Sequence, residues 1–207
     1  GKIAGYLDQE KGKSEISHAN SIKNNPELNL VVLYDKDKTK AEKLGKDYDV
    51  SYCVDSMEDF LSYELDIMVV CTPDDAHFHT ISKILSSANL PSILFVEKPV
   101  CQTETQLEQL LDFNKKVPII VNHSRRYDNR YRQLKTEIKN NEFGRIVQVD
   151  MQYYGGWKHN GIHLIDLLMY LFESEIKIES VFSEIKSKYS DDPTLGIFAS
   201  LDNGRVP

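Results

Sequence analysis

Short apolar runs alternate with helical patterns along the first 122 residues. The runs are rich in valine, isoleucine and leucine and end at polar residues or at proline, which is typical of buried strands. Between them, apolar residues recur three and four positions apart, as in helices that pack on a sheet. We expect Thr39 and Glu42 to form a capping box at the first helix. We predict strands over residues 30–34, 65–71, 92–96 and 118–122, and helices over residues 39–48, 57–62, 76–87 and 103–116.

Continuous apolar strands separated by helices predict a parallel sheet that is covered on both faces. In such sheets, ligands bind at the carboxyl ends of the strands. The fold class is therefore α/β, with a binding site expected along one rim of the sheet. In this sequence the strand ends carry Asp35, Thr72-Pro73-Asp74, Glu97-Lys98-Pro99 and Asn122-His123.

The pattern changes after Asn122, where strands follow one another with few helices between them. This order is typical of an α+β domain with a mostly antiparallel sheet. We therefore expect two domains, residues 1–122 and residues 123–207. In the second we predict a charged helix over residues 129–141, an alternating strand over 145–154, an amphipathic helix over 160–172, and strands over 176–189 and 195–201.

Both ends of the sequence interrupt this pattern. The strand expected before a phosphate-binding loop is not found ahead of Gly1, and the turn at residues 202–205 would lead into a further strand. We therefore expect either a fragment of a longer chain or a chain whose disordered segments are left out.

Composition narrows the classes of partner. Apolar residues make up 41% and charged residues 28%, an ordinary globular balance, and 25 Lys and Arg against 32 Asp and Glu give a net charge of −7. Nucleic acid and anionic membranes are therefore not expected partners. The longest apolar runs are far shorter than the roughly 20 residues of a membrane span, and the polar opening predicts no signal peptide. Three cysteines without metal-ligand spacing predict reduced thiols in a cytoplasmic protein.

Two segments have the chemistry of a dinucleotide site. Gly1-Lys2-Ile3-Ala4 fits the end of a glycine-rich loop, in which a side chain would block the backbone from approaching a pyrophosphate. Asp35 ends an apolar strand, where its carboxylate would accept hydrogen bonds from ribose hydroxyls and repel a 2′-phosphate, which favours NAD. Lys36 and Lys38 lie beside Asp35, so NADP is not excluded as the cofactor. The alternative for Asp35 is that it lies in a solvated turn and binds no cofactor.

Two further turns lie where a substrate would meet the cofactor. Glu97-Lys98-Pro99 follows a strand directly, so Lys98 lies at the edge of the sheet, where it can take part in proton transfer. A cis bond before Pro99 would fit such a turn. Thr72 and Pro73 end the preceding strand, with His77 four residues on, and Thr72 offers a hydroxyl to the nicotinamide half of a dinucleotide. The residues of these two segments that we expect to bind the cofactor are Thr72, Pro73, His77, Glu97 and Lys98. Ordinary surface turns are the alternative for both segments.

The predicted helix over residues 160–172 opens with a polar cluster. His159, His163 and Asp166 are four and three residues apart and can share one face, where Asp166 would fix the tautomer of His163. A polar helix start capped by Asn160 is the alternative. The two histidines also have metal-ligand spacing, but no third ligand is evident, so we predict no metal. The expected core stripe of this helix is Ile162, Ile165, Leu168, Met169 and Phe172.

Taken in order, these motifs resemble the glucose–fructose oxidoreductase / inositol dehydrogenase (Gfo/Idh/MocA) family of NAD(P)-dependent oxidoreductases. Arg125-Arg126-Tyr127 and Phe143-Gly144-Arg145-Ile146 extend the resemblance through nearly the whole chain. It implies a Rossmann domain with a doubly wound parallel sheet, followed by an α+β domain. The open antiparallel sheet of that second domain often mediates oligomers, so we expect a homodimer or homotetramer.

The resemblance also implies roles for individual residues. Lys98 would bind the reacting hydroxyl or carbonyl group, and His163 would be its acid/base partner, with hydride transfer between NAD and a secondary alcohol of a sugar-like substrate. The family often has an aspartate four residues before this histidine, where this chain has His159. We therefore expect Lys98, His163 and His159 to be the catalytic residues, with chemistry that differs from the family's usual arrangement. A pair of neighbouring arginines would suit the phosphates of a nucleotide sugar, although solvated charges at the start of a domain explain the two arginines equally well. The residues expected on the substrate side are Arg125, Arg126, Tyr127, Tyr154, Asn160 and Asp166.

Two other functions stay open at this point. One is an NAD-dependent glycosidase on the same fold, in which transient oxidation of a sugar carbon enables elimination of the leaving group. The other is a regulatory paralogue that binds a dinucleotide without turnover, which the histidine at position 159 keeps open.

Overall fold

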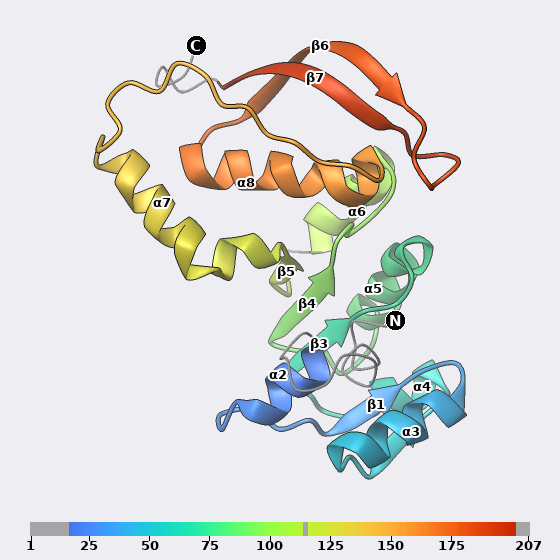
Figure 1. Cartoon of the computed structure of the whole chain (residues 1–207). Helices are drawn as coiled ribbons and strands as arrows, with labels where there is room; N and C mark the ends of the chain where they lie inside the picture. Colours follow the sequence, from blue (N-terminus) through green and yellow to red (C-terminus); the bar gives the residue numbers. More distant parts are fainter. Residues whose placement is uncertain (1–16, 114–115, 202–207) are drawn as a thin grey trace. The chain divides into compact units, whose positions relative to one another are not determined.

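The chain forms two units, which meet in the sequence between Asn122 and His123. The structure is a computed structural model that describes residues 17–113 and 116–201 (Figure 1). Each unit has its own apolar core, and each is considered by itself.

Parallel strands form the first unit. β1 (Val32–Tyr34) pairs with β2 (Tyr52–Val54), and β4 (Ile93–Glu97) lies between β3 (Ile67–Val70) and β5 (Ile119–Asn122). They form one two-stranded and one three-stranded sheet, and all of their pairings are parallel, which confirms the predicted parallel α/β fold. Sequence reasoning missed β2, because its three residues lie between Ser51 and Asp55 and are not part of a longer apolar run like the one that contains β1.

Helices connect these strands. They are α2 (His18–Asn24), α3 (Lys38–Tyr48), α4 (Met57–Leu61), the 3₁₀ turn η2 (Asp74–Ala76), α5 (His77–Leu85) and α6 (Glu104–Phe113). The predicted cap of the first long helix was wrong. Asp37, not Thr39, is the N-cap of α3, and its carboxylate accepts hydrogen bonds from the backbone N–H and the hydroxyl of Thr39. An ionised carboxylate is a strong acceptor for these N-terminal donors, so it starts the helix two residues early.

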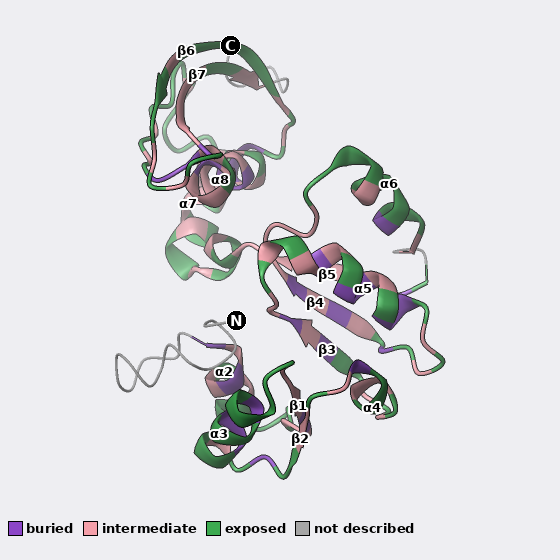
Figure 2. Ribbon diagram, turned by 90° about the vertical axis from the view of Figure 1, so that its right-hand side faces the viewer, coloured by how far each residue is buried: buried purple, intermediate pink, exposed green. Residues whose placement is uncertain are grey.

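The core of the first unit lies between the central strands and their helices. Burial alternates along β4, where Leu94 and Val96 are buried and their neighbours half-buried (Figure 2). Ile81 and Ile84 of α5 are buried in the same cluster. Burying one such side chain stabilises the fold by about 1.5–3 kcal/mol, so this cluster holds the strand ends rigidly in place.

The second unit combines helices with an antiparallel pair of strands. Its elements are the 3₁₀ turn η3 (Ser124–Tyr127), α7 (Asn129–Lys139), the π-helical turn η4 (Trp157–Gly161), α8 (Ile162–Phe172), β6 (Ile176–Ile185) and β7 (Thr194–Leu201). The β6–β7 pairing confirms the predicted antiparallel sheet. Leu167, Leu171 and Phe172 of α8 form its core with residues of α7.

Two predictions for this unit were wrong. Residues 145–154 form no strand, although their apolar and polar residues alternate, because β6 and β7 pair with each other and no described strand bonds to this segment. The core stripe of α8 was wrong in part. Phe172 is buried as predicted, but Met169 is exposed and Leu167 and Leu171 are buried, because the face of α8 that packs against α7 includes these two leucines.

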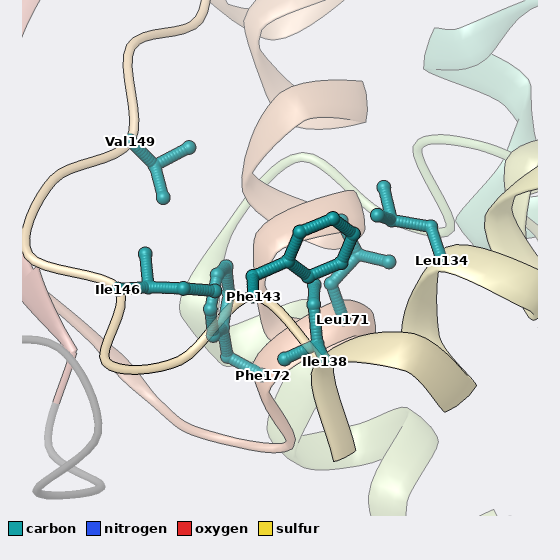
Figure 3. Close-up of a pocket in the computed structure, with 7 residues that line it drawn as sticks. All are labelled: Leu134, Ile138, Phe143, Ile146, Val149, Leu171 and Phe172. Carbon is teal, nitrogen blue, oxygen red and sulfur yellow. The ribbon is translucent and has the colours of Figure 1, made fainter. Parts of the chain in front are cut away.

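An apolar pocket of about 330 Å³ lies between α7, α8 and the segment that follows α7 (Figure 3). Its lining carries no charged or hydrogen-bonding side chain, so it does not have the chemistry expected of a redox site. The lining residues are Leu134, Ile138, Phe143, Ile146, Val149, Leu171 and Phe172.

Candidate functional site

His77 joins two turns at the carboxyl ends of β3 and β4. Its side chain has no exposed surface, its Nδ1 lies 2.6 Å from the carbonyl oxygen of Pro99, and its Nε2 lies 2.8 Å from that of Thr72. Carbonyl oxygens only accept hydrogen bonds, so a neutral ring donates to one of them and a protonated ring to both. The imidazole therefore acts on the two turns and not on a ligand directly.

Glu97 is anchored at the end of β4. Its Oε1 accepts hydrogen bonds from His18 Nε2 and Asn122 Nδ2, each at 2.7 Å. Burial by itself would raise the pKa of Glu97, but these two hydrogen bonds and the charges of His18 and Lys98 outweigh it and lower the pKa below its ordinary value. Glu97 is therefore an ionised anchor that fixes the backbone directly before Lys98.

Lys98 is half-buried at this rim, and the peptide bond between Lys98 and Pro99 is cis, as the sequence analysis expected. Thr72 lies on the neighbouring turn. Its hydroxyl oxygen is buried and has no hydrogen-bond partner among the described residues. A buried hydroxyl without a partner is costly, so a ligand that bonded to it would be favoured.

Burial raises the pKa of the adjacent Cys71 thiol to about 12, so this cysteine is not a nucleophile.

Asp35 lies directly after β1, at the carboxyl end of the parallel β1–β2 pair. Its backbone N–H donates to the carbonyl of Val54, and its Oδ1 accepts from the backbone N–H of Asp37 at 3.0 Å. Its side chain is thus held at the rim by the backbone. Pro73 is exposed on the turn after β3. Gly1, Lys2 and Ile3, expected in the phosphate loop, lie outside the described residues.

In the second unit, Arg126 and Asp166 form an ion pair. Arg126 Nε donates to both carboxylate oxygens at 3.0 Å, and its Nη2 donates to Oδ1 at 2.6 Å. These hydrogen bonds raise the pKa of Arg126 although burial opposes the shift. His123 Nδ1 lies 3.5 Å from the same carboxylate, and the His123 ring meets His163 edge to face, with 6.3 Å between centroids. Asp166 therefore gathers Arg126 and His123 beside His163.

The remaining candidates of this unit lie on the polar stretch before α8 and on η3. Tyr127 and Tyr154 are exposed, with Tyr154 83% accessible. The side-chain amide of Asn160 donates to the carbonyl oxygen of Tyr154 at 2.6 Å, so Asn160 holds this stretch in place instead of capping α8 through its side chain. His159 is bonded through Nδ1 to Asp192 at 2.7 Å.

Sequence reasoning did not single out His18 or Asp192. His18 is 79 residues from Glu97, and Asp192 is 33 residues from His159. Neither lies in a motif, so no local signal in the sequence marks them.

Metal-binding clusters and membrane-spanning helices are both absent from the described residues. No group of three or more His, Cys, Asp and Glu side chains is arranged to hold a metal ion. None of the helices in the described segments has the length and apolar character needed to cross a membrane.

A sequence profile of the oxidoreductase family with an NAD-binding Rossmann fold matches residues 11–123, more than half of the 207 residues. The chain is 23% identical over 211 residues to the uncharacterized oxidoreductase YrbE of Bacillus subtilis (strain 168), a match that covers 91% of this chain and 61% of the relative. The chain therefore spans less than two thirds of that relative's length.

Solved structures share the fold. Myo-inositol dehydrogenase from Lactobacillus casei, in complex with NAD(H) and myo-inositol, is 21% identical with a TM-score of 0.71, over 91% of this chain and 61% of that chain. A super-repressor mutant of Gal80p from Saccharomyces cerevisiae is 19% identical with a TM-score of 0.72, over 88% and 59%. At these identities the similarity establishes the fold alone.

Proposed function

Because the chain belongs to the oxidoreductase family with an NAD-binding Rossmann fold (Gfo/Idh/MocA), we propose that it transfers a hydride between NAD and a secondary alcohol or ketone of a sugar, polyol or nucleotide sugar. The observation that carries this proposal is the placement of Lys98. It follows the anchored carboxylate of Glu97 and precedes the turn that His77 fixes, so a half-buried ammonium is held at the rim where this fold binds ligands.

The residues at the rim fit a dinucleotide. The buried hydroxyl of Thr72, without a partner among the described residues, would gain a hydrogen bond from a ligand. Asp35 would accept hydrogen bonds from the ribose hydroxyls, which favours NAD, while the exposed Lys36 and Lys38 keep NADP open. Gly1, Lys2 and Ile3 would hold the phosphates. When bound, NAD supplies the hydride acceptor, or as NADH the donor.

The chain's own side chains supply the proton chemistry. In alcohol oxidation, the ammonium of Lys98 donates a hydrogen bond to the reacting oxygen and stabilises the alkoxide that develops there. His163 removes the proton of the hydroxyl group and returns it in the reverse direction. We place Arg126, Tyr127, Tyr154, Asn160 and Asp166 on the substrate side, where the Arg126–Asp166 pair orients the polar groups around His163.

A Lys98→Met variant tests this proposal. We expect NADH formation to fall about a hundredfold or more over a panel of polyols, sugars and nucleotide sugars, with NAD affinity within about twofold of wild type. Lys83→Met is the matched control, since Lys83 is an exposed lysine of the same unit. Wild-type rates in Lys98→Met would refute the assigned role.

The same assay separates the other candidate functions. Sugar released without net NADH would identify an NAD-dependent glycosidase. NAD binding without turnover over the whole panel would identify a regulatory protein, a function favoured by the imidazole of His159 where the family often has a carboxylate.

We further propose a cytoplasmic homodimer or homotetramer that assembles through the β6–β7 sheet. Large apolar side chains are exposed on these strands, and Phe182 packs against Phe198 with ring centroids 4.8 Å apart. Light scattering on wild type and Phe182→Glu would test the assembly, and a wild-type monomer would refute it.

All three cysteines are free, as expected in a reducing compartment, and fractionation of cells would test the location.

A further inference from the structure

Asp192 is a buried carboxylate that holds the start of the helix carrying His159 and His163. Its side chain is 1% exposed. Its Oδ1 accepts from the backbone N–H of Lys158 at 2.7 Å. Its Oδ2 accepts from the backbone N–H of His159 at 3.0 Å and from Nδ1 of the His159 ring at 2.7 Å. The carboxylate therefore binds one residue through both its main chain and its side chain.

The loop that carries Asp192 is fixed from several directions. Ser187 Oγ donates to the carbonyl oxygen of Asp192 at 2.7 Å, and the backbone N–H of Trp157 donates to the carbonyl of Pro193 at 2.9 Å. Gly156 has a φ of +98°, and a Cβ at this position would overlap the Asp192 carboxylate. A glycine is therefore required where the two segments meet.

Asp192 stays ionised in this setting. Burial by itself would raise its pKa, but the hydrogen bonds from the backbone of Lys158 and from the ring and backbone of His159 outweigh it and lower the pKa below its ordinary value. An ionised carboxylate has no proton to donate and only accepts.

The His159 ring has little freedom to turn. It stacks on Tyr189 with ring centroids 3.6 Å apart and an interplanar angle of 5°. Rotation about the ring axis would break both this stack and the bond to Asp192. The His159 side chain nevertheless keeps 33% of its surface exposed, so the ring is held in place without being enclosed.

From this geometry we propose that Asp192 is a positioning residue that holds His159 with the proton on Nδ1, so that Nε2 can accept the proton that His163, four residues further along, removes from the alcohol. The tautomer follows because only a protonated Nδ1 can donate to the carboxylate, which leaves the lone pair of the neutral ring on Nε2. The proton moves from the hydroxyl oxygen to His163 and from His163 to Nε2 of His159, Nδ1–H stays bonded to Asp192, and the carboxylate then faces an imidazolium. The catalytic part of this inference rests on the proposed function.

Nitrogen-15 NMR of the imidazole rings in the 207-residue chain tests the tautomer without substrate or cofactor, with His159→Gln to assign the signal. We expect the neutral His159 ring of wild type to carry its proton on Nδ1. In Asp192→Asn, the amide oxygen can accept from the backbone N–H of Lys158 while the amide nitrogen takes the place of Oδ2 and donates to Nδ1. The backbone N–H of His159 then loses its acceptor, and the ring proton moves to Nε2. Asp191→Asn, at an exposed aspartate next in sequence, is the control and should keep the wild-type tautomer.

Kinetics provide the second readout. We expect Asp192→Asn to lower kcat about tenfold or more with KM within about threefold, whereas Asp191→Asn matches wild type. A wild-type ring with its proton on Nε2, or an Asp192→Asn ring with an unchanged tautomer, would overturn the inference and leave Asp192 as a helix cap. The wild-type spectrum decides this even if the variant does not fold. Wild type that binds NAD but turns over no substrate would overturn the proposed function, and with it the catalytic role, but not the tautomer.

Discussion

Glu97 and His18 are joined by a 2.7 Å hydrogen bond although 79 residues separate them. The bond links α2 to the end of β4, and Asn122 donates to the same oxygen from β5. Three segments distant in the sequence thus meet at the carboxylate that precedes Lys98.

Because Glu97 is held in its ionised form, we expect its contribution to the free energy of unfolding to fall in acid. The pKa of folded Glu97 is lowered, so its stabilisation is fully present above the carboxyl pKa of the unfolded chain, about 4.3, and is lost as pH falls through the lowered value. The difference in unfolding free energy between wild type and Glu97→Gln should therefore shrink from about pH 6 to about pH 3 in urea titrations. Glu104→Gln, at an exposed helix position, should show little difference at either pH. A constant difference for Glu97→Gln would contradict the prediction.

Replacing His77 should loosen two turns at once. His77→Leu removes the ring that lies within hydrogen-bonding distance of the Thr72 and Pro99 carbonyls, at about 1–3 kcal/mol for each carbonyl left unsatisfied. We expect a loss of about 2 kcal/mol or more in unfolding free energy, together with weaker NAD binding measured by calorimetry. His79→Leu, on an exposed position of the same helix, should change stability by no more than about 0.5 kcal/mol. Equal effects of the two variants would rule out the bridging role.

Asp35 should set the choice between NAD and NADP. Removing its charge in Asp35→Asn removes the repulsion of a 2′-phosphate, so the ratio of kcat/KM for NAD to that for NADP should fall about tenfold or more. Asp66→Asn makes the same charge change at the amino end of β3 and should leave the ratio unchanged. An unchanged ratio in Asp35→Asn would place the dinucleotide's ribose elsewhere.

The Arg126–Asp166 pair should stabilise the second unit. Arg126→Met leaves the carboxylate of Asp166, 9% exposed, without its main partner. Because Arg126 itself is 42% exposed, we expect a cost of about 2 kcal/mol, below the roughly 3–5 kcal/mol of a fully buried pair. Arg145→Met, at an exposed arginine of the same unit, should cost no more than about 0.5 kcal/mol. Chemical denaturation of both variants measures the difference.

The parallel sheet could be predicted because its strands are buried and therefore apolar without interruption, as in Ile67–Val70. The segment 145–154 shows the limit of such reasoning. Its alternation is typical of a strand, but a strand also requires a hydrogen-bonding neighbour, and no local pattern reports whether one is present.

The position of Lys98 on the rim was predictable because it follows a strand directly. Its supports were not. His18 and Asp192 act through contacts across 79 and 33 residues, and a single histidine or aspartate in a polar stretch does not reveal its partner. The same holds for the core face of α8, which depends on how α7 packs against it.

His77 contacts the two turns through their main-chain carbonyls, so these contacts do not depend on the side chains of the turns. Both of its acceptors belong to the main chain, which every amino acid supplies alike. Side chains around the two turns can therefore be exchanged over evolution, altering what the rim recognises, while the backbone that presents Lys98 keeps its course. The side-chain atoms of the two turns can thus change specificity, while their main-chain atoms preserve the geometry.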